Sequence, residues 1–495
     1  MNLRRNLLAL AAMLLCLPVA AHAAADVKPV NMGKGVQVWF EEDHMLPIIA
    51  MTVSLPAGSG YDPADKAGLA AFAAAMLDEG AGSYTSQAYQ TALSDRGIRL
   101  SARPDRDSMT ITLVTLKENA KDAFHLLGEA LSKPRFDNDA IARVRSQILS
   151  SLQENEGDPS SVAARAFFTR FFAGHPYGHP VDGYAGSIAA ITRDDLRNFA
   201  RDHWVRGGMH IAVSGDIDTT GLKALLATAF RALPQKVPAP IPPVRRMGDP
   251  GVKVIPMPVP QPNVVFGLPS LPRKDKDFIP LYVANYILGG GGFSSRLTTE
   301  VREKRGLTYS ISTSVNTQKR AGYFAGQVAT KAGSVQQTVQ VIRSTIADFA
   351  KNGPTQKELD DAKTYLTGSF PLAFTSNAGI TAQLNAFQDN DLPISYLKQR
   401  NGLINAVTVD DVRHAASRVF ARGGLTVVIA GSPQAQTQRA VPLPGPDKPT
   451  APPKPVSSSK QPIPAKALRP SKAPLPVPRA AHPVAAAPAA NTPKH

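Results

Sequence analysis

Two kinds of apolar pattern alternate along most of the chain and together predict a mixed protein of helices and strands. Short runs rich in β-branched residues predict strands. Longer segments with apolar residues three and four positions apart predict helices. The predicted strands are 36–40, 48–55, 108–116, 209–214, 264–268, 308–315, 322–329 and 425–430. The predicted helices are 63–78, 86–96, 120–131, 138–156, 191–204, 279–288, 295–304, 334–352, 355–369 and 409–420.

Two sequence blocks occur twice at the same separation. ITRDDLR at 191–197 matches VTVDDVR at 407–413, and RGGMHIAVSG at 206–215 matches RGGLTVVIAG at 422–431. Both pairs are 216 residues apart (407 − 191 and 422 − 206). One shared offset without a gap indicates an internal duplication. We therefore predict an α+β fold with two homologous halves.

The ends of the chain differ in composition from these halves. Arg4 and Arg5, an apolar stretch and Ala21-His22-Ala23 are typical of a secretory signal. The last 55 residues contain 16 prolines and no aromatic residue, which predicts a disordered or polyproline tail. The predicted organisation is a signal peptide at 1–24, a first half at 25–232, a Pro-rich linker at 233–250, a second half at 251–434 and a tail at 435–495.

The positive charge is concentrated outside the predicted halves. The formal net charge is +16, of which the signal carries +2 and residues 441–495 carry +7, which leaves +7 (16 − 2 − 7). No aromatic RNA-binding motif or zinc-finger spacing accompanies it, so the pattern argues against nucleic-acid binding. The basic tail predicts at most a tether to an acidic surface. The single cysteine, Cys16, lies in the signal, so the mature chain has no disulfide.

The segment AGLAAFAAAMLDEG at 67–80 resembles a motif of the pitrilysin/insulinase family of zinc peptidases. In that family, H-x-x-E-H places two histidine ligands and a general-base glutamate on one helix. The flanking Gly, Leu, Phe, Met and Leu match the family. The three chemical positions are Ala71, Ala74 and Ala75, whose methyl groups neither bind zinc nor move a proton.

The third zinc ligand of the family is a glutamate on a later helix. The matching stretch is SSLQENEGDP at 150–159, which places Ser151 at the ligand position. The resemblance therefore implies the fold of the family, two halves closed like a clam around a chamber, without its zinc site. We expect no cofactor in this chain and no catalytic residue. An active metallopeptidase with an unrecognised site is the less favoured alternative.

The second half keeps more of the family pattern. GGGGFSSRLTTEVREKRGLTYS at 289–310 resembles the segment that reaches the active site from the other half. The resemblance implies that Arg302 and Tyr309 bind substrate, since a guanidinium and a phenol donate directed hydrogen bonds. Otherwise Arg302 is a surface charge and Tyr309 a core residue. The glycines Gly290, Gly291 and Gly292 either contact substrate or serve only for packing.

Two further features have open interpretations. His175 and His179 have i, i+4 spacing, but Pro176 and Gly178 lie between them, which favours a structural loop over a metal site. The stretch 100–108 lies near the position where the family adds substrate to a sheet edge. Pro104 is expected to interrupt that ladder.

Together these patterns predict an exported, non-catalytic member of the family, acting in the periplasm and possibly envelope-associated through its tail. The family includes heterodimers, so the expected partner is a subunit that bears H-x-x-E-H and holds the zinc, with a peptide as substrate. The alternative is a stand-alone peptide-binding or scaffold protein.

Overall fold

The computed structural model describes residues 26–33, 36–421 and 424–432. The predicted signal peptide, the tail from 435 and two residues of the second RGG block lie outside these ranges. The strands are β1 (Val27–Asn31), β2 (Val36–Glu42), β3 (Ile48–Leu55), β4 (Arg99–Pro104), β5 (Met109–Leu116), β6 (Met209–Gly215), β7 (Gly251–Ile255), β8 (Asn263–Pro269), β9 (Ile311–Gln318), β10 (Ala321–Ala329) and β11 (Thr426–Ala430).

The helices of the first half and the second half follow the strands in a similar order. They are α2 (Leu69–Ala75), α3 (Ser86–Asp95), α4 (Ala120–Ser132), α5 (Asn138–Gly157), α6 (Pro159–Phe171), α7 (Ala185–Ala190), α8 (Arg193–His203), α9 (Thr219–Phe230), α10 (Phe278–Asn285), α11 (Val335–Asn352), α12 (Gln356–Gly368), α13 (Asn377–Asp389), α14 (Tyr396–Asn405) and α15 (Val409–Phe420). Among the described residues, no helix is both long and apolar enough to cross a membrane.

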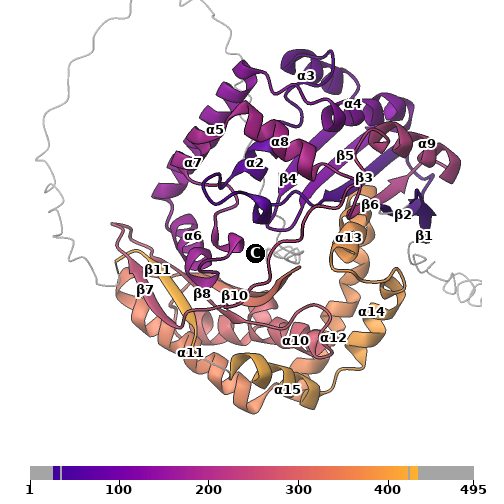
Figure 1. Cartoon of the computed structure of the whole chain (residues 1–495). Coiled ribbons are helices and arrows are strands. Elements are labelled where there is room, and N and C mark those ends of the chain that lie inside the picture. The colour runs from indigo at the N-terminus through magenta and orange to yellow at the C-terminus, as the bar shows by residue number, and fades with distance from the viewer. Residues whose placement is uncertain (1–25, 34–35, 422–423, 433–495) are drawn as a thin grey trace, which may run out of the picture. The chain divides into compact units, whose positions relative to one another are not determined.

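The two sheets have the same strand order (Figure 1). The first runs β1-β2-β6-β3-β5-β4 and the second β7-β11-β8-β10-β9. β2 pairs with β6 in parallel, as β7 does with β11, and the other pairs are antiparallel. Apart from β1, each strand thus has a counterpart with the same neighbours. The predicted α+β fold with two homologous, mainly antiparallel halves is confirmed, while the chamber between them stays a prediction.

Two helices are exchanged between the halves. α6 comes from the first half but packs on β8 and β11 of the second sheet (Figure 1). Its phenylalanines Phe167 and Phe171 are buried in one cluster with Val265, Tyr323 and Val428. A helix of the first half therefore completes the core of the second.

The second half supplies the reciprocal helix. α13 packs on β3 and β6 of the first sheet (Figure 1). Ile380, Leu384 and Phe387 lie in one buried cluster with Trp39 and Ala212 of the first half. α6 and α13 begin at positions 159 and 377, which are 218 residues apart (377 − 159) and close to the repeat offset. The exchange therefore follows the internal duplication.

The predicted helix at 63–78 is wrong in its extent. α2 begins only at Leu69, because Gly68 has a left-handed backbone (φ 93°) that cannot be part of a right-handed helix. Asp62 still caps the helix, but across a loop: its carboxylate accepts hydrogen bonds from the amides of Gly68 and Ala70, at 2.8 Å each. α2 ends at Ala75, and a turn leads to Gly80.

Several other predictions agree closely with the structure. α5 and α15 lie within one residue of the predicted helices, and residues 233–250 contain no strand or α-helix. The predicted helix at 295–304 contains a π-helical turn, Thr298–Glu303. Pro104 is the last residue of β4 and pairs with Met109, so the β4–β5 ladder is intact up to Pro104 and ends there. The expected interruption of a substrate ladder stays a prediction.

Candidate functional site

The four positions that correspond to the zinc ligands and the general base of the family lie on two helices that contact each other. Ala71, Ala74 and Ala75 lie on α2, which contacts α5, the helix of Ser151. Ala71 is partly exposed and Ala75 and Ser151 are exposed, whereas Ala74 faces the core and is 3 % exposed. These four positions thus carry methyl groups and one hydroxyl.

These side chains do not fit a zinc ion. Zinc in proteins is bound by imidazole nitrogens, thiolates or carboxylates. Ala71, Ala75 and Ser151 supply none of them, and among the residues that the structure describes no group of three or more His, Cys, Asp or Glu side chains is placed to hold a metal. The chain therefore keeps the helix pair but not the donor set.

The end of α2 is fixed by a partly buried ion pair that the sequence did not reveal. Arg143 of α5 donates to both carboxylate oxygens of Glu79, and Ser86 donates to the same carboxylate at 2.5 Å. Burial raises the pKa of Glu79, but the hydrogen bonds from Arg143 and Ser86 outweigh it and lower the pKa overall. This pair ties the segment after α2 to α3 and α5.

Asp62 provides a partly buried carboxylate at the start of α2. Burial raises its pKa to about 7, although the amides of Ala70 and Gly68 donate to it and oppose the rise. Gly68 has no room for a side chain, since an added Cβ would lie 2.7 Å from Cδ1 of Ile188. Both ends of α2 are thus held by specific contacts, even though its chemical positions are alanines.

Arg302 and Tyr309 lie on the surface of the second half. Tyr309 precedes β9 and is 83 % exposed, so the alternative of a core strand residue is wrong. Arg302 is partly buried and its guanidinium lies 4.6 Å from the ring centroid of Phe293, itself 66 % exposed. Within the described residues, no hydrogen bond or ion pair of either side chain is recorded.

The glycine run has a packing role. An added Cβ on Gly290 would lie 2.7 Å from Nδ2 of Asn285, and one on Gly291 would lie 2.8 Å from the carbonyl oxygen of Tyr286. Gly292 has φ 59° with open space around it. Close packing accounts for Gly290 and Gly291, and a substrate contact of the three glycines stays a prediction.

The loop HPYG at 175–178 has a structural role. Both ring nitrogens of His175 are engaged: one accepts a hydrogen bond from the amide of Tyr177 at 3.1 Å, and the other lies 2.9 Å from the carbonyl oxygen of Pro242. His175 is 8 % exposed. The tyrosine hydroxyl donates to Asp107, whose other oxygen accepts from the amide of Lys319 in the second half at 2.8 Å. This loop therefore joins the halves.

Comparisons with known proteins agree with this fold. Residues 37–183 match the family model of insulinase, peptidase family M16, and residues 190–366 match that of the peptidase M16 inactive domain. A protein of Helicobacter pylori named "Non-peptidase homolog YmxG" is 30 % identical over 73 % of this chain and 83 % of its own length. An "Uncharacterized zinc protease" of Streptomyces coelicolor is 29 % identical over 60 % of this chain and 66 % of its own length.

A solved structure is also similar. The crystal structure of a peptidase M16 inactive domain from Pseudomonas fluorescens superposes with a TM-score of 0.78 at 32 % identity, and covers 82 % of this chain and 98 % of that one. The fold and the altered helix pair thus define a zinc-peptidase scaffold without the zinc ligands. The chain belongs to the peptidase M16 (insulinase) family. The substituted ligand positions and these relatives support a non-catalytic member of it.

Proposed function

We propose that this chain is the non-catalytic subunit of a heteromeric zinc peptidase in the periplasm. A partner that bears H-x-x-E-H holds the zinc, while this chain completes the chamber and orients the peptide. The proposal rests on one contrast: Ala71, Ala75 and Ser151 cannot bind metal, whereas Arg302 and Tyr309 remain accessible. The predicted signal peptide supports the periplasmic location.

The chemistry of the second half supports substrate orientation. A guanidinium offers several N–H donors in one plane, which suits a peptide carbonyl or a terminal carboxylate. Phe293 packs against Arg302 and limits its freedom, so that less conformational entropy is lost when a ligand binds. The exposed phenol of Tyr309 adds a second directed donor.

The first experiment is isolation of the tagged protein from its native host in mild salt, with mass spectrometry of co-purifying chains. We expect a near-equimolar partner that contains H-x-x-E-H. In the reconstituted complex, Arg302→Ala and Tyr309→Phe should each lower kcat/KM for peptide cleavage about tenfold or more, since a charged hydrogen bond contributes about 1.5–3 kcal/mol.

Arg305→Ala is the matched control. Arg305 lies three residues from Arg302, but it is paired with Glu300 at 2.6 Å. Its replacement should leave turnover within about twofold, because exposed ion pairs contribute about 0–1 kcal/mol. Unchanged turnover in Arg302→Ala, with the complex intact, would rule out the orienting role.

A stand-alone peptide-binding protein is the second candidate, and the edge of the first sheet favours it. In the part of the chain that the structure describes, β4 pairs only with β5, and its other edge is unpaired. Beside it lies a cavity of about 450 Å³ between α3 and β4. Its apolar lining is formed by Leu93, Ile98, Leu100 and Val114. An extended peptide added to this edge would place side chains there.

Hydrogen exchange of the isolated chain distinguishes the two candidates. If the protein binds peptide alone, an unstructured peptide should slow amide exchange in β4. The corresponding edge strand of the second half, β9, is the internal control and should not change. No protection of β4 at saturating peptide would contradict this second function.

A further inference from the structure

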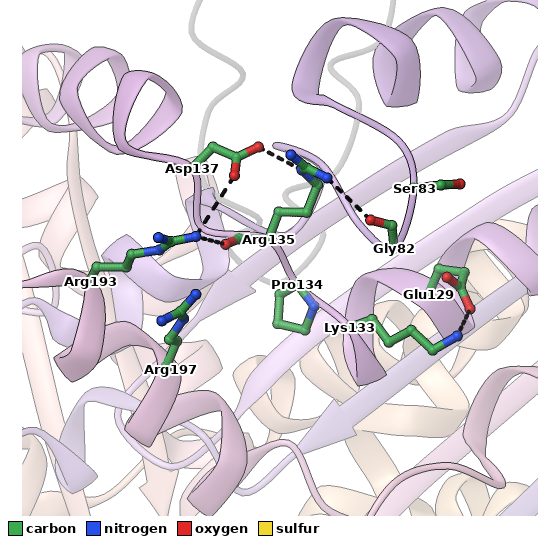
Figure 2. A pocket seen from close by; sticks show the side chains of 9 residues that line it. All are labelled: Gly82, Ser83, Glu129, Lys133, Pro134, Arg135, Asp137, Arg193 and Arg197. Carbon is green, nitrogen blue, oxygen red and sulfur yellow. Dashed lines mark hydrogen bonds and ion pairs between the residues drawn. The ribbon is translucent and has the colours of Figure 1, made fainter.

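A cation-rich cavity of about 700 Å³ lies on the first half (Figure 2). It forms where the segment between α4 and α5 meets α8 and the loop after α2. Its lining consists of Gly82, Ser83, Glu129, Lys133, Pro134, Arg135, Asp137, Arg193 and Arg197. Three separate parts of the chain therefore line one cavity, and two of them, residues 129–137 and α8, contribute charged side chains.

The carboxylates of this cavity do not balance its cations. Four basic side chains face two acidic ones, so the lining has a formal charge of +2 (4 − 2). Glu129 is engaged by Lys133 at 2.8 Å, and Asp137 by Arg135 at 2.6 Å (Figure 2). Of the two remaining cations, Arg197 is 3.8 Å from the carboxylate of Asp194, which is 84 % exposed.

Arg193 has hydrogen-bonding capacity that the protein does not use. Its Nη2 donates to the carbonyl oxygen of Arg135 at 2.9 Å and lies 3.8 Å from Asp137 (Figure 2). Its Nε atom is buried and has no hydrogen-bond partner within the described residues. Buried donors are normally paired, so an unpaired one next to a cavity calls for an acceptor.

The backbone that carries these cations is held in a costly conformation. Phe136, between Arg135 and Asp137, is buried and has φ 48°, a left-handed value that a non-glycine residue rarely adopts. The amide of Gly82 donates to the carbonyl oxygen of Lys133 at 2.9 Å, and Nη1 of Arg135 donates to that of Gly82 at 3.3 Å. Such conformations persist where surrounding contacts hold them, often at ligand sites.

The duplication shows that the fold itself does not require this charge. In the second half, Val409 occupies the position of Arg193 at the repeat offset, and Arg413 that of Arg197. At the offset of 218 that relates the starts of α5 and α12 (356 − 138), Lys133 corresponds to Lys351 and Arg135 to Gly353. Two of the four cations, Arg135 and Arg193, are therefore specific to the first half.

We propose that this cavity binds a phosphate group, either as free inorganic phosphate or as part of a phosphomonoester. A dianion matches the formal charge of +2, and guanidinium groups bind phosphate oxygens through paired N–H donors. Arg197 and Lys133 supply donors that their own partners leave unused. The cavity is wide enough to hold an organic group attached to the phosphate.

The test is titration calorimetry of the full mature chain with inorganic phosphate at low ionic strength and pH 7.5. We expect one saturable site per chain. Arg197→Gln and Lys133→Gln should each weaken binding at least tenfold. Arg413→Gln is the matched control, since Arg413 holds the equivalent place in the repeat and is 47 % exposed against 50 % for Arg197. It should change the Kd less than twofold.

Glycerol phosphate distinguishes the two sources of the phosphate group. Tighter binding than inorganic phosphate identifies a phosphomonoester ligand, and equal or weaker binding identifies free phosphate. The proposal is overturned if phosphate gives no saturable heat with a chain that melts normally. It is also overturned if Arg413→Gln weakens binding as much as Arg197→Gln, or if an acidic peptide binds where phosphate does not.

Discussion

Thr52 and Thr381 are 329 residues apart in sequence, yet the hydroxyl of Thr52 donates to that of Thr381 at 2.9 Å in the buried contact between β3 and α13. The contact is the centre of a polar set on one face of α13. Asn385 donates to Ser54 at 3.1 Å, and Gln388 donates to the carbonyl oxygen of Ile211 at 3.2 Å. Directed hydrogen bonds therefore fix how the two halves meet.

Removal of one of these polar side chains should destabilise the whole protein. Asn385→Ala leaves a cavity and removes the hydrogen bonds that Asn385 donates to Ser54 and to the carbonyl oxygen of His210, and we expect a loss of about 2–4 kcal/mol in the free energy of unfolding. Urea denaturation followed by circular dichroism measures it. Asn405→Ala, at an exposed position of α14, is the control and should stay within about 0.5 kcal/mol. Equal effects would mean that the polar contact is not stabilising.

Asp62 should make stability fall as the pH rises. Its pKa is raised from 3.8 to about 7 by burial, so between these values the folded state holds a proton that the unfolded state lacks. Its contribution is therefore present below about pH 4 and is lost as the pH rises to about 7.

The variant Asp62→Asn tests this contribution through the melting temperature between pH 4 and 8. The melting temperature of the variant should fall less between pH 4 and 8 than that of the unmodified protein. Asp65→Asn, at an exposed position in the same loop, should keep the full decline. An identical pH profile in Asp62→Asn and the unmodified chain would contradict the assignment.

Removing Arg143 alone should cost more stability than removing both charged groups of its ion pair with Glu79. Arg143→Leu leaves a carboxylate that is 10 % exposed without its partner, with an expected cost of about 1–3 kcal/mol. Arg143 itself is 47 % exposed, so screening by water places the effect in the lower part of that range. Adding Glu79→Gln to Arg143→Leu should recover stability, as measured by urea denaturation. A more stable Arg143→Leu single variant would contradict this account.

The retained helix pair should accept a rebuilt metal site. Ala71→His, Ala75→His and Ser151→Glu together restore two imidazoles and a carboxylate on α2 and α5, and we expect one zinc per chain by elemental analysis. The unmodified protein should bind none. Adding Ala74→Glu places a carboxylate at a position that is 3 % exposed, so the melting temperature should fall. A correctly folded triple variant without zinc would show that the spacing of α2 and α5 differs from that of an active site.

Sequence patterns predicted the duplication and most elements because their apolar faces are regular. α13 escaped prediction because its buried face is polar in part: Thr381, Asn385 and Gln388 follow helical spacing but lower the hydrophobic signal. The true start of α2 was also missed, since Asp62 and Pro63 form a good local capping signal. Only the tertiary structure shows that this carboxylate caps a helix six residues further on.

The loss of the zinc ligands could be predicted from the sequence, but the cation-rich cavity could not. The alanines at 71, 74 and 75 could be aligned with a known motif, and the exposure of Tyr309 agrees with a binding role. In the sequence, Arg193 and Arg197 could be recognised only as residues of the repeated block at 191–197. Their approach to Lys133 and Arg135 depends on the strained backbone at Phe136, which no local pattern encodes.

The exchange of α6 and α13 has a consequence for the folding of the chain. A polypeptide with only one repeat would leave the apolar face of its sheet open to water until a second copy supplied the covering helix. A single repeat is therefore not expected to fold as a stable monomer, and each half of the present chain depends on the covering helix that the other half supplies.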